Sequence, residues 1–132
     1  LDSMVEEYVN QGFDLIIPLI DARRMEVYTA FFDGKSGKMI SETEAKILDE
    51  TSFSELADKK ILFIGDGAKK AQEILNLPNA EFKFDIYPSA KGLIKKSIEK
   101  FNLKDFEDVA YFEPFYLKDF QGIKKADRVK KQ

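Results

Sequence analysis

The sequence contains neither cysteine nor histidine. The lack of cysteine excludes a disulfide scaffold, a thiolate zinc site and a thiol nucleophile. The lack of histidine excludes Ser-His and Cys-His catalytic pairs, histidine metal motifs and the usual general base at neutral pH. Hydrolase and metalloprotease mechanisms that depend on cysteine or histidine are therefore excluded, whereas chemistry that uses carboxylates is not.

Long apolar runs and an excess of positive charge are also missing. The longest apolar run is far shorter than the roughly 20 residues that span a bilayer, and no basic-then-apolar leader is visible. We therefore expect a cytoplasmic location and no membrane partner. The net charge is −3, whereas a free-standing nucleic-acid-binding domain usually carries a strong basic excess. Nucleic-acid binding is therefore not expected of the body of this protein.

The sequence does contain enough apolar residues for one core. Its 132 residues are the usual length of a single domain, 44% of them are hydrophobic, and twelve are phenylalanine. No internal repeat or long linker is visible. We predict one domain over residues 1–132, in which residues 119–132 form a frayed basic tail. The first residue is leucine, so we expect a processed or excised piece of a longer protein.

The central feature is a predicted hairpin. Two apolar runs, residues 15–20 and 27–32, flank the polar connection Asp21-Ala22-Arg23-Arg24, which predicts two antiparallel strands. Regular pairing is expected to begin only near Pro18, because proline cannot donate to the ladder. The second strand, residues 26–33, is apolar on both faces, so helices should cover both sides of the sheet. A third strand at residues 38–48 carries charge on one face, as edge strands do.

The rest of the chain alternates between helices and short strands. Helices are predicted over residues 1–12, 52–57, 68–75 and 88–101, and strands over 61–64 and 82–84. The first two helices should begin with capping boxes, Ser3 with Glu6 and Ser52 with Glu55. In the last helix, lysines should face solvent and the apolar stripe should be buried. The stripe consists of Ala90, Leu93, Ile94, Ser97, Ile98 and Phe101.

This order of elements predicts an α/β fold with a mixed five-stranded sheet. An antiparallel three-strand meander would be followed by two parallel strands, with helices on the faces. The first, fourth and fifth strands should run parallel, by the right-handed crossover rule. That is the layout of a ribonuclease H-like lobe.

Four segments resemble the TsaB (YeaZ) family, whose members are needed to make threonylcarbamoyladenosine in tRNA. Residues 20–30, I-D-A-R-R-M-E-V-Y-T-A, are similar to the I-D-A-R-R-x-E-V-Y segment of that family. Residues 65–68 match its G-D-G-A, and residues 87–93 match its P-x-A-x-x-L helix start. Residues 114–118 match its P-x-Y-L-R, with Lys118 in place of arginine. The segments occur in family order and cover nearly the whole chain.

The resemblance implies one half of a two-lobed, actin-like (ASKHA) protein. The first lobe of the family carries an I-D-T-S strand and a G-P-G-S-F-T-G-x-R segment, and neither is in this sequence. The chain therefore resembles the C-terminal (second) lobe only, and the missing N-terminal lobe is its expected partner. In the family, the first lobe pairs with the transferase TsaD, which works with an ATPase partner, and TsaB is a scaffold. The resemblance thus implies a non-catalytic lobe without a cofactor, with ATP relevant only to the full-length protein or the complex.

Two other functions stay open. Family members have also been classified as glycoproteases. A nucleotide- or metal-dependent enzyme lobe is therefore the first alternative. It would use Asp21, Glu26 and Asp66 near the strand ends, although their spacing matches no metal motif. The second alternative is a homodimer formed through an exposed strand edge.

The turn Gly65-Asp66-Gly67-Ala68 is the candidate nucleotide-side turn. In actin-like ATPases the equivalent glycine turn lies beside the adenosine of the bound nucleotide. Glycines let a ligand approach the backbone, and a helix N-terminus favours anions. The structural alternative, which we favour, is a tight strand-to-helix turn with Asp66 as the N-cap.

Two segments are candidate interfaces. Asp21, Arg23 and Arg24 could bind a phosphate, a carboxylate or the neighbouring lobe; the alternative is a solvated hairpin end with Asp21 or Glu26 as salt partner. The aromatic arm could contact the missing lobe or cover the core of this lobe, and we favour the second. Its candidate residues are Tyr111, Phe112, Pro114 and Tyr116. The basic tail is expected to be solvated rather than bound to tRNA phosphates.

Overall fold

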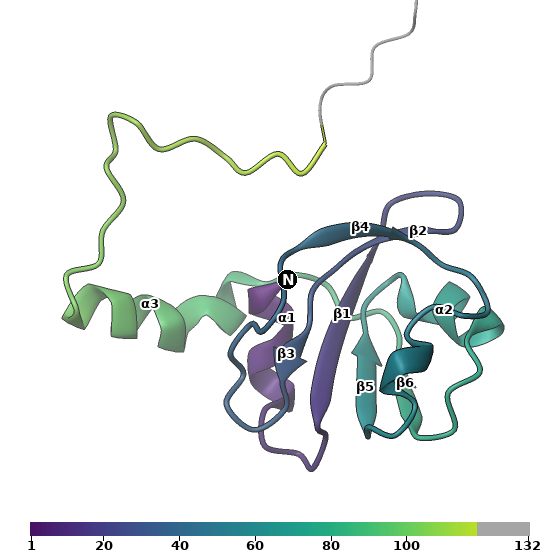
Figure 1. Ribbon diagram of the computed structural model, residues 1–132. Helices are drawn as coiled ribbons and strands as arrows, with labels where there is room; N and C mark the ends of the chain where they lie inside the picture. Colours follow the sequence, from purple (N-terminus) through teal and green to yellow (C-terminus); the bar gives the residue numbers. More distant parts are fainter. Residues whose placement is uncertain (119–132) are drawn as a thin grey trace, which may run out of the picture.

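The computed structural model describes residues 1–118, which are built around one mixed sheet (Figure 1). The order of the strands is β4-β2-β1-β5-β6, with β3 also paired to β1. Antiparallel pairing joins β1 to β2 and β3, and β2 to β4, while β1, β5 and β6 run parallel. The strands are β1 (Leu15–Asp21), β2 (Glu26–Thr29), β3 (Phe32–Asp33), β4 (Glu44–Ile47), β5 (Ile61–Ile64) and β6 (Ala80–Lys83). The predicted meander and parallel strands are therefore confirmed.

The sheet has six strands rather than five because the second predicted strand is interrupted. β2 and β3 share one register along β1, since Leu19 pairs with Thr29 and Ile16 with Phe32. Continuing that register places Ala30, in the gap between β2 and β3, opposite Pro18. Pro18 has no N–H to donate, so the ladder is interrupted there. The prediction that pairing begins near Pro18 is wrong, because β1 already pairs on both sides at Leu15.

The third predicted strand is shorter than expected. Only Glu44–Ile47 form β4, and Met39 makes one isolated bridge to Phe32. Between them the chain leaves the ladder, and the hydroxyl of Ser41 accepts a hydrogen bond from the amide of Phe31 at 2.8 Å. As predicted, β4 lies at one edge of the sheet.

The helical elements are short, and the two predicted capping boxes do not form. In the described part of the chain, no side chain caps α1 or η2. The hydroxyl of Ser52 instead accepts a hydrogen bond from the amide of Asp49 at 3.0 Å. Ser89 does accept a bond from the amide of Lys91, at the predicted start of the last helix. The elements are α1 (Asp2–Val5), η1 (Glu6–Tyr8), η2 (Ser54–Leu56), α2 (Ala68–Ile74), η3 (Ala90–Leu93) and α3 (Ile94–Asn102).

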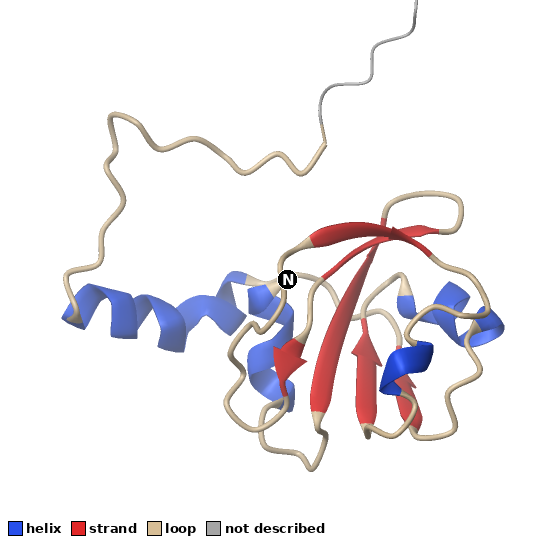
Figure 2. Cartoon of the chain, in the orientation of Figure 1, coloured by secondary structure: helices blue, strands red, loops and turns tan. Residues whose placement is uncertain are grey.

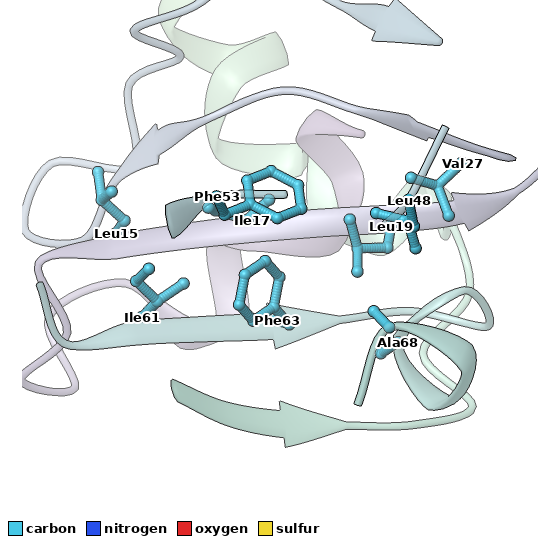
Figure 3. Close-up of a cluster of buried hydrophobic side chains, with 10 residues drawn as sticks. Leu15, Ile17, Leu19, Val27, Leu48, Phe53, Ile61, Phe63 and Ala68 are labelled. Atoms are coloured by element: carbon cyan, nitrogen blue, oxygen red, sulfur yellow. The ribbon is translucent and has the colours of Figure 1, made fainter. Parts of the chain in front are cut away.

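Each face of the sheet carries its own core. On one face α2 and the segment around η2 cover odd-numbered side chains such as Ile17 and Phe63 (Figure 3). On the other face α1 and η1 cover even-numbered ones such as Ile16 and Leu62. The alternation follows from the period of two along a strand. Burial on both faces confirms the expectation drawn from the apolar runs.

The last helix departs from the prediction. Its apolar stripe is exposed to solvent, with exposed fractions of 56% for Ile94, 55% for Ile98 and 68% for Phe101. The helix points away from the sheet, and residues 103–118 follow as an extended arm (Figures 1 and 2). Both faces of the sheet are already covered by other elements, and no residue of α3 belongs to either core. Among residues 1–118, no helix is long and apolar enough to cross a membrane.

Thr29 carries the one buried hydroxyl that lacks a hydrogen-bond partner within residues 1–118. Its side chain is fully buried, and a buried unpaired hydroxyl costs about 1–3 kcal/mol. We expect Thr29→Val, which keeps the shape, to leave the free energy of unfolding unchanged or raise it by about 1–2 kcal/mol. Thr29→Ser, which keeps the hydroxyl and removes a methyl group, should lower it by about 1 kcal/mol. Urea unfolding of both variants tests this; a destabilised valine variant would contradict it.

Candidate functional site

The carboxyl ends of β1 and β5 form the topological switch point of the sheet. After β1 the chain turns back through β2 and β4 on one side, and β5 and β6 lie on the other. In open α/β sheets, ligands bind where the strand order diverges in this way. Asp21 ends β1 and the turn Gly65-Asp66-Gly67 follows β5. Two segments that the sequence pointed to separately therefore meet at this position.

Asp21, Asp66 and Lys70 form a hydrogen-bonded network at the switch point. The backbone amide of Asp21 donates to Oδ1 of Asp66 at 2.9 Å. Oδ1 of Asp21 accepts from the amide of Arg23 at 2.6 Å and from Nζ of Lys70 at 2.9 Å. The carboxylate of Asp66 thus ties the turn after β5 to the end of β1. Asp66 was expected to cap α2, but α2 begins after Gly67, and the carboxylate is used in this bridge instead.

Lys70, on α2, uses all its donors within the protein. Nζ donates to Oδ1 of Asp21 at 2.9 Å, to the carbonyl of Arg24 at 2.9 Å and to the carbonyl of Glu26 at 2.7 Å. An ammonium group has three donors, so none remains for a phosphate. Nothing in the sequence distinguishes Lys70 from the other lysines. It follows Lys69 directly, and only the position of α2 against the hairpin distinguishes the two.

The two glycines of the turn lie against the backbone of β1. The amide of Gly67 donates to the carbonyl of Leu19 at 3.0 Å. A Cβ at position 65 would lie 2.3 Å from the same carbonyl oxygen, and one at position 67 would lie 3.0 Å from it. Close packing between neighbouring segments therefore explains both glycines. The role of this turn beside a nucleotide stays a prediction.

Removing the Lys70 ammonium should weaken the hairpin. Lys70→Met would leave the carbonyls of Arg24 and Glu26 and the carboxylate of Asp21 without this donor. Because the Lys70 side chain is only 16% exposed, we expect the free energy of unfolding to fall by about 1–3 kcal/mol. Lys69→Met, at the exposed neighbouring position, is the matched control and should change it by less than about 0.5 kcal/mol. Equal effects in denaturant unfolding would show that the network contributes nothing.

The lowered pKa values of three aspartates lead us to expect that stability depends on pH. The hydrogen bond from Lys70, followed by that from the amide of Arg23, lowers the pKa of Asp21 below its ordinary 3.8. Hydrogen bonds from Ser36 and Thr51 lower the pKa values of Asp33 and Asp49 in the same way. A lowered folded-state pKa stabilises the protein above the unfolded value, and that contribution disappears as pH falls through the folded value. The melting temperature should therefore be level down to about pH 4 and fall below it, and Asp21→Asn should reduce that fall.

Arg23 and Arg24 are exposed at the tip of the hairpin, and their expected salt partners are engaged elsewhere. Asp21 is paired with Lys70, and Glu26 is paired with Lys118 at 2.6 Å. The local salt partner expected in the alternative is therefore not formed, whereas the exposure of both arginines fits its solvated hairpin end. Within residues 1–118, neither guanidinium forms a salt bridge or a side-chain hydrogen bond.

The aromatic arm does not cover the core of the described lobe. Tyr111, Phe112 and Tyr116 are 84%, 61% and 79% exposed, and Pro114 is exposed as well. Contact with the sheet returns at Lys118, whose ammonium binds Glu26 and lies 5.9 Å from the ring centroid of Tyr28. The prediction that the arm covers its own lobe is wrong, because both faces of the sheet are already occupied. The basic tail, residues 119–132, lies outside the described residues.

The described residues also bear on metal binding. Within residues 1–118, no group of three or more acidic side chains is placed to hold a metal ion. Asp21 and Asp66 are close, and Oδ1 of each carboxylate is engaged, in Asp21 by Arg23 and Lys70 and in Asp66 by the Asp21 amide.

The topology defines a ribonuclease H-like, actin-like lobe. The sequence matches no protein-family model and no curated protein. Among solved structures, YeaZ from Pseudomonas aeruginosa is similar, with a TM-score of 0.70 and 18% identity over 89% of this chain and 55% of that chain. An uncharacterized protein with similarity to peptidase YEAZ from Pseudomonas aeruginosa has a TM-score of 0.67 and 20% identity, over 89% and 56%.

These similarities confirm the resemblance at the level of the fold. The chain spans a little over half the length of both proteins, which is consistent with one lobe of a two-lobed protein. At identities near 20%, this likeness establishes the fold alone.

Proposed function

We propose that this chain is the non-catalytic second lobe of a TsaB-type scaffold. In this role it supports a TsaD-type transferase and its ATPase partner in forming threonylcarbamoyladenosine on tRNA. The observation that carries the proposal is the network at the switch point of a YeaZ-like fold. The ammonium of Lys70 is fully used by Asp21 and two carbonyls, so it holds the hairpin rather than a substrate.

The exposed apolar surface of α3 and the arm supports a role as part of a larger assembly. Large exposed apolar patches generally mark interaction sites. In this protein, one such surface runs along α3 and continues through the arm. It includes Ile94, Ile98, Phe101, Phe106, Tyr111 and Tyr116. We propose that the first lobe of the two-lobed protein covers this surface, as expected for the partner that the resemblance implies.

Complementation tests the proposed function. A bacterial strain depleted of its own TsaB should regain threonylcarbamoyladenosine, measured by mass spectrometry of tRNA nucleosides, when it expresses the natural gene product containing this chain together with its cognate transferase and ATPase. The matched control expresses the same gene product without residues 1–118. Full restoration by that control would contradict the proposal.

A binding measurement separates the scaffold from the enzyme alternative. Calorimetric titration of this chain with ATP and Mg²⁺ should show no binding at millimolar nucleotide, and the chain should release no phosphate. Saturable ATP binding or hydrolysis by the chain alone would favour a nucleotide-dependent enzyme lobe over the scaffold.

A further inference from the structure

The tip of the β1–β2 hairpin has an unusual backbone. Arg23 and Arg24 have φ values of +73° and +49°. Non-glycine residues rarely adopt this left-handed region, and each costs of the order of 1 kcal/mol relative to glycine. Asparagine or glycine would fit both positions with less strain. The protein therefore holds two consecutive arginines where smaller residues would make the hairpin more stable.

Hydrogen bonds from the surrounding residues hold this strained tip in place. The amide of Arg23 donates to Asp21 at 2.6 Å, and the carbonyl of Arg24 accepts from Lys70 at 2.9 Å. The amide of Glu26 closes the turn on the carbonyl of Arg23 at 3.0 Å. These bonds use the backbone and leave the guanidinium groups as the donors that face outward. A guanidinium presents a planar fork suited to a carboxylate.

The surroundings of the two arginines favour a protein partner. They line a shallow surface hollow together with Met25 and Ile47, which are 37% and 70% exposed. Arginine and methionine beside exposed apolar side chains are typical of protein interfaces. The protein is acidic, with a net charge of −3, and Asp49 and Glu50 follow Ile47 closely. The overall negative charge disfavours a polyanionic phosphate backbone more than it disfavours a single carboxylate.

The end of the exposed arm lies beside this hollow. Lys118, at the end of the arm, binds the carboxylate of Glu26, which lines the same hollow. A partner seated on the arginines can therefore also reach the end of the arm at Lys118. We propose that Arg23 and Arg24 bind carboxylate groups on the first lobe of the two-lobed protein and so fix the two lobes together. This inference rests on the proposed function, because it requires that lobe.

The experiment compares the same substitutions in two contexts, this chain alone and the natural gene product with the first lobe. In the chain alone, Arg23→Asn with Arg24→Gly should raise the melting temperature by about 2–5 °C, because the backbone strain is relieved. In the two-lobed protein the same pair should lower it by a similar amount, because the contacts between lobes are lost. Arg23→Glu with Arg24→Glu should lower it further there.

Lys35→Glu with Lys38→Glu is the control for charge. Both lysines are exposed, and the pair changes the net charge by the same amount as the double arginine reversal. It should shift the melting temperature equally in both contexts.

The outcomes separate this inference from the proposed function. If the Asn–Gly pair raises the melting temperature in both contexts, the arginines do not join the lobes, and the inference fails while the scaffold role stands. If the natural gene product has no first lobe, both fail. If the arginine reversals leave the melting temperatures unchanged but abolish binding to tRNA in gel-shift titration, the partner is nucleic acid and the inference is overturned.

Discussion

Replacing Phe63 by alanine should lower the free energy of unfolding by about 3–5 kcal/mol. Phe63 lies on β5, pairs with Ile17 of β1, and is fully buried. Its ring is 5.2 Å from that of Phe53 and 5.1 Å from that of Phe82, measured between centroids. Strands pack on both sides of β5, so the neighbouring side chains cannot collapse easily into the cavity. The free-energy cost of the lost burial and that of the residual cavity therefore add.

Guanidinium unfolding monitored by circular dichroism measures this loss. Phe112→Ala is the matched control, since Phe112 is 61% exposed and its removal should change stability by less than about 0.5 kcal/mol. A loss below about 1 kcal/mol for Phe63→Ala would mean that the core on this face is not packed as described.

Replacing Gly65 by alanine should lower the free energy of unfolding by roughly 3 kcal/mol or more, because two penalties combine. The φ of Gly65 is +122°, a conformation that side chains rarely adopt. The added Cβ would also lie 2.3 Å from the carbonyl oxygen of Leu19. Either the turn or β1 must move, and the hydrogen bond from Gly67 to Leu19 would be strained with it.

Gly12→Ala separates these two penalties. Gly12 has a φ of +88°, but a Cβ there would meet nothing within 4 Å. Gly12→Ala should therefore lower the free energy of unfolding only by the cost of the backbone conformation, about 1–2 kcal/mol. Equal losses for the two variants in urea unfolding would show that the contact with Leu19 does not matter.

Much of the sheet could be predicted from the sequence because its signal is local. The run Ile61–Ile64 is apolar on both faces, and the strand has the predicted bounds. The order of strands follows from short connections and the handedness of crossovers. The split between β2 and β3 was missed, although its cause, Pro18, was already recognised as unfavourable in a ladder. Pro18 interrupts the neighbouring strand at Ala30, and that position can be predicted only when the register between the two strands is known.

The site was predictable only in part. The sequence pointed to Asp21 and Asp66, but it did not show that one binds the amide of the other. That contact spans 45 residues and exists only because β1 and β5 are neighbours. Lys70 was missed for the same reason, since its three acceptors all come from the hairpin on the other side of the switch point.

The sequence by itself determined the class of fold, the resemblance to the TsaB family and the charged hairpin tip formed by Arg23 and Arg24. These depend on residue type and local periodicity, which are properties of the chain alone. Only the tertiary structure decided that Lys70 uses all three of its hydrogen-bond donors within the protein. It also decided that the backbone of the two arginines is strained and their side chains are unpaired within the described residues. Finally, it decided that α3 and the arm stay exposed. Hydrogen-bond partners and buried faces depend on which segments meet, and an amphipathic helix does not specify the surface against which it packs.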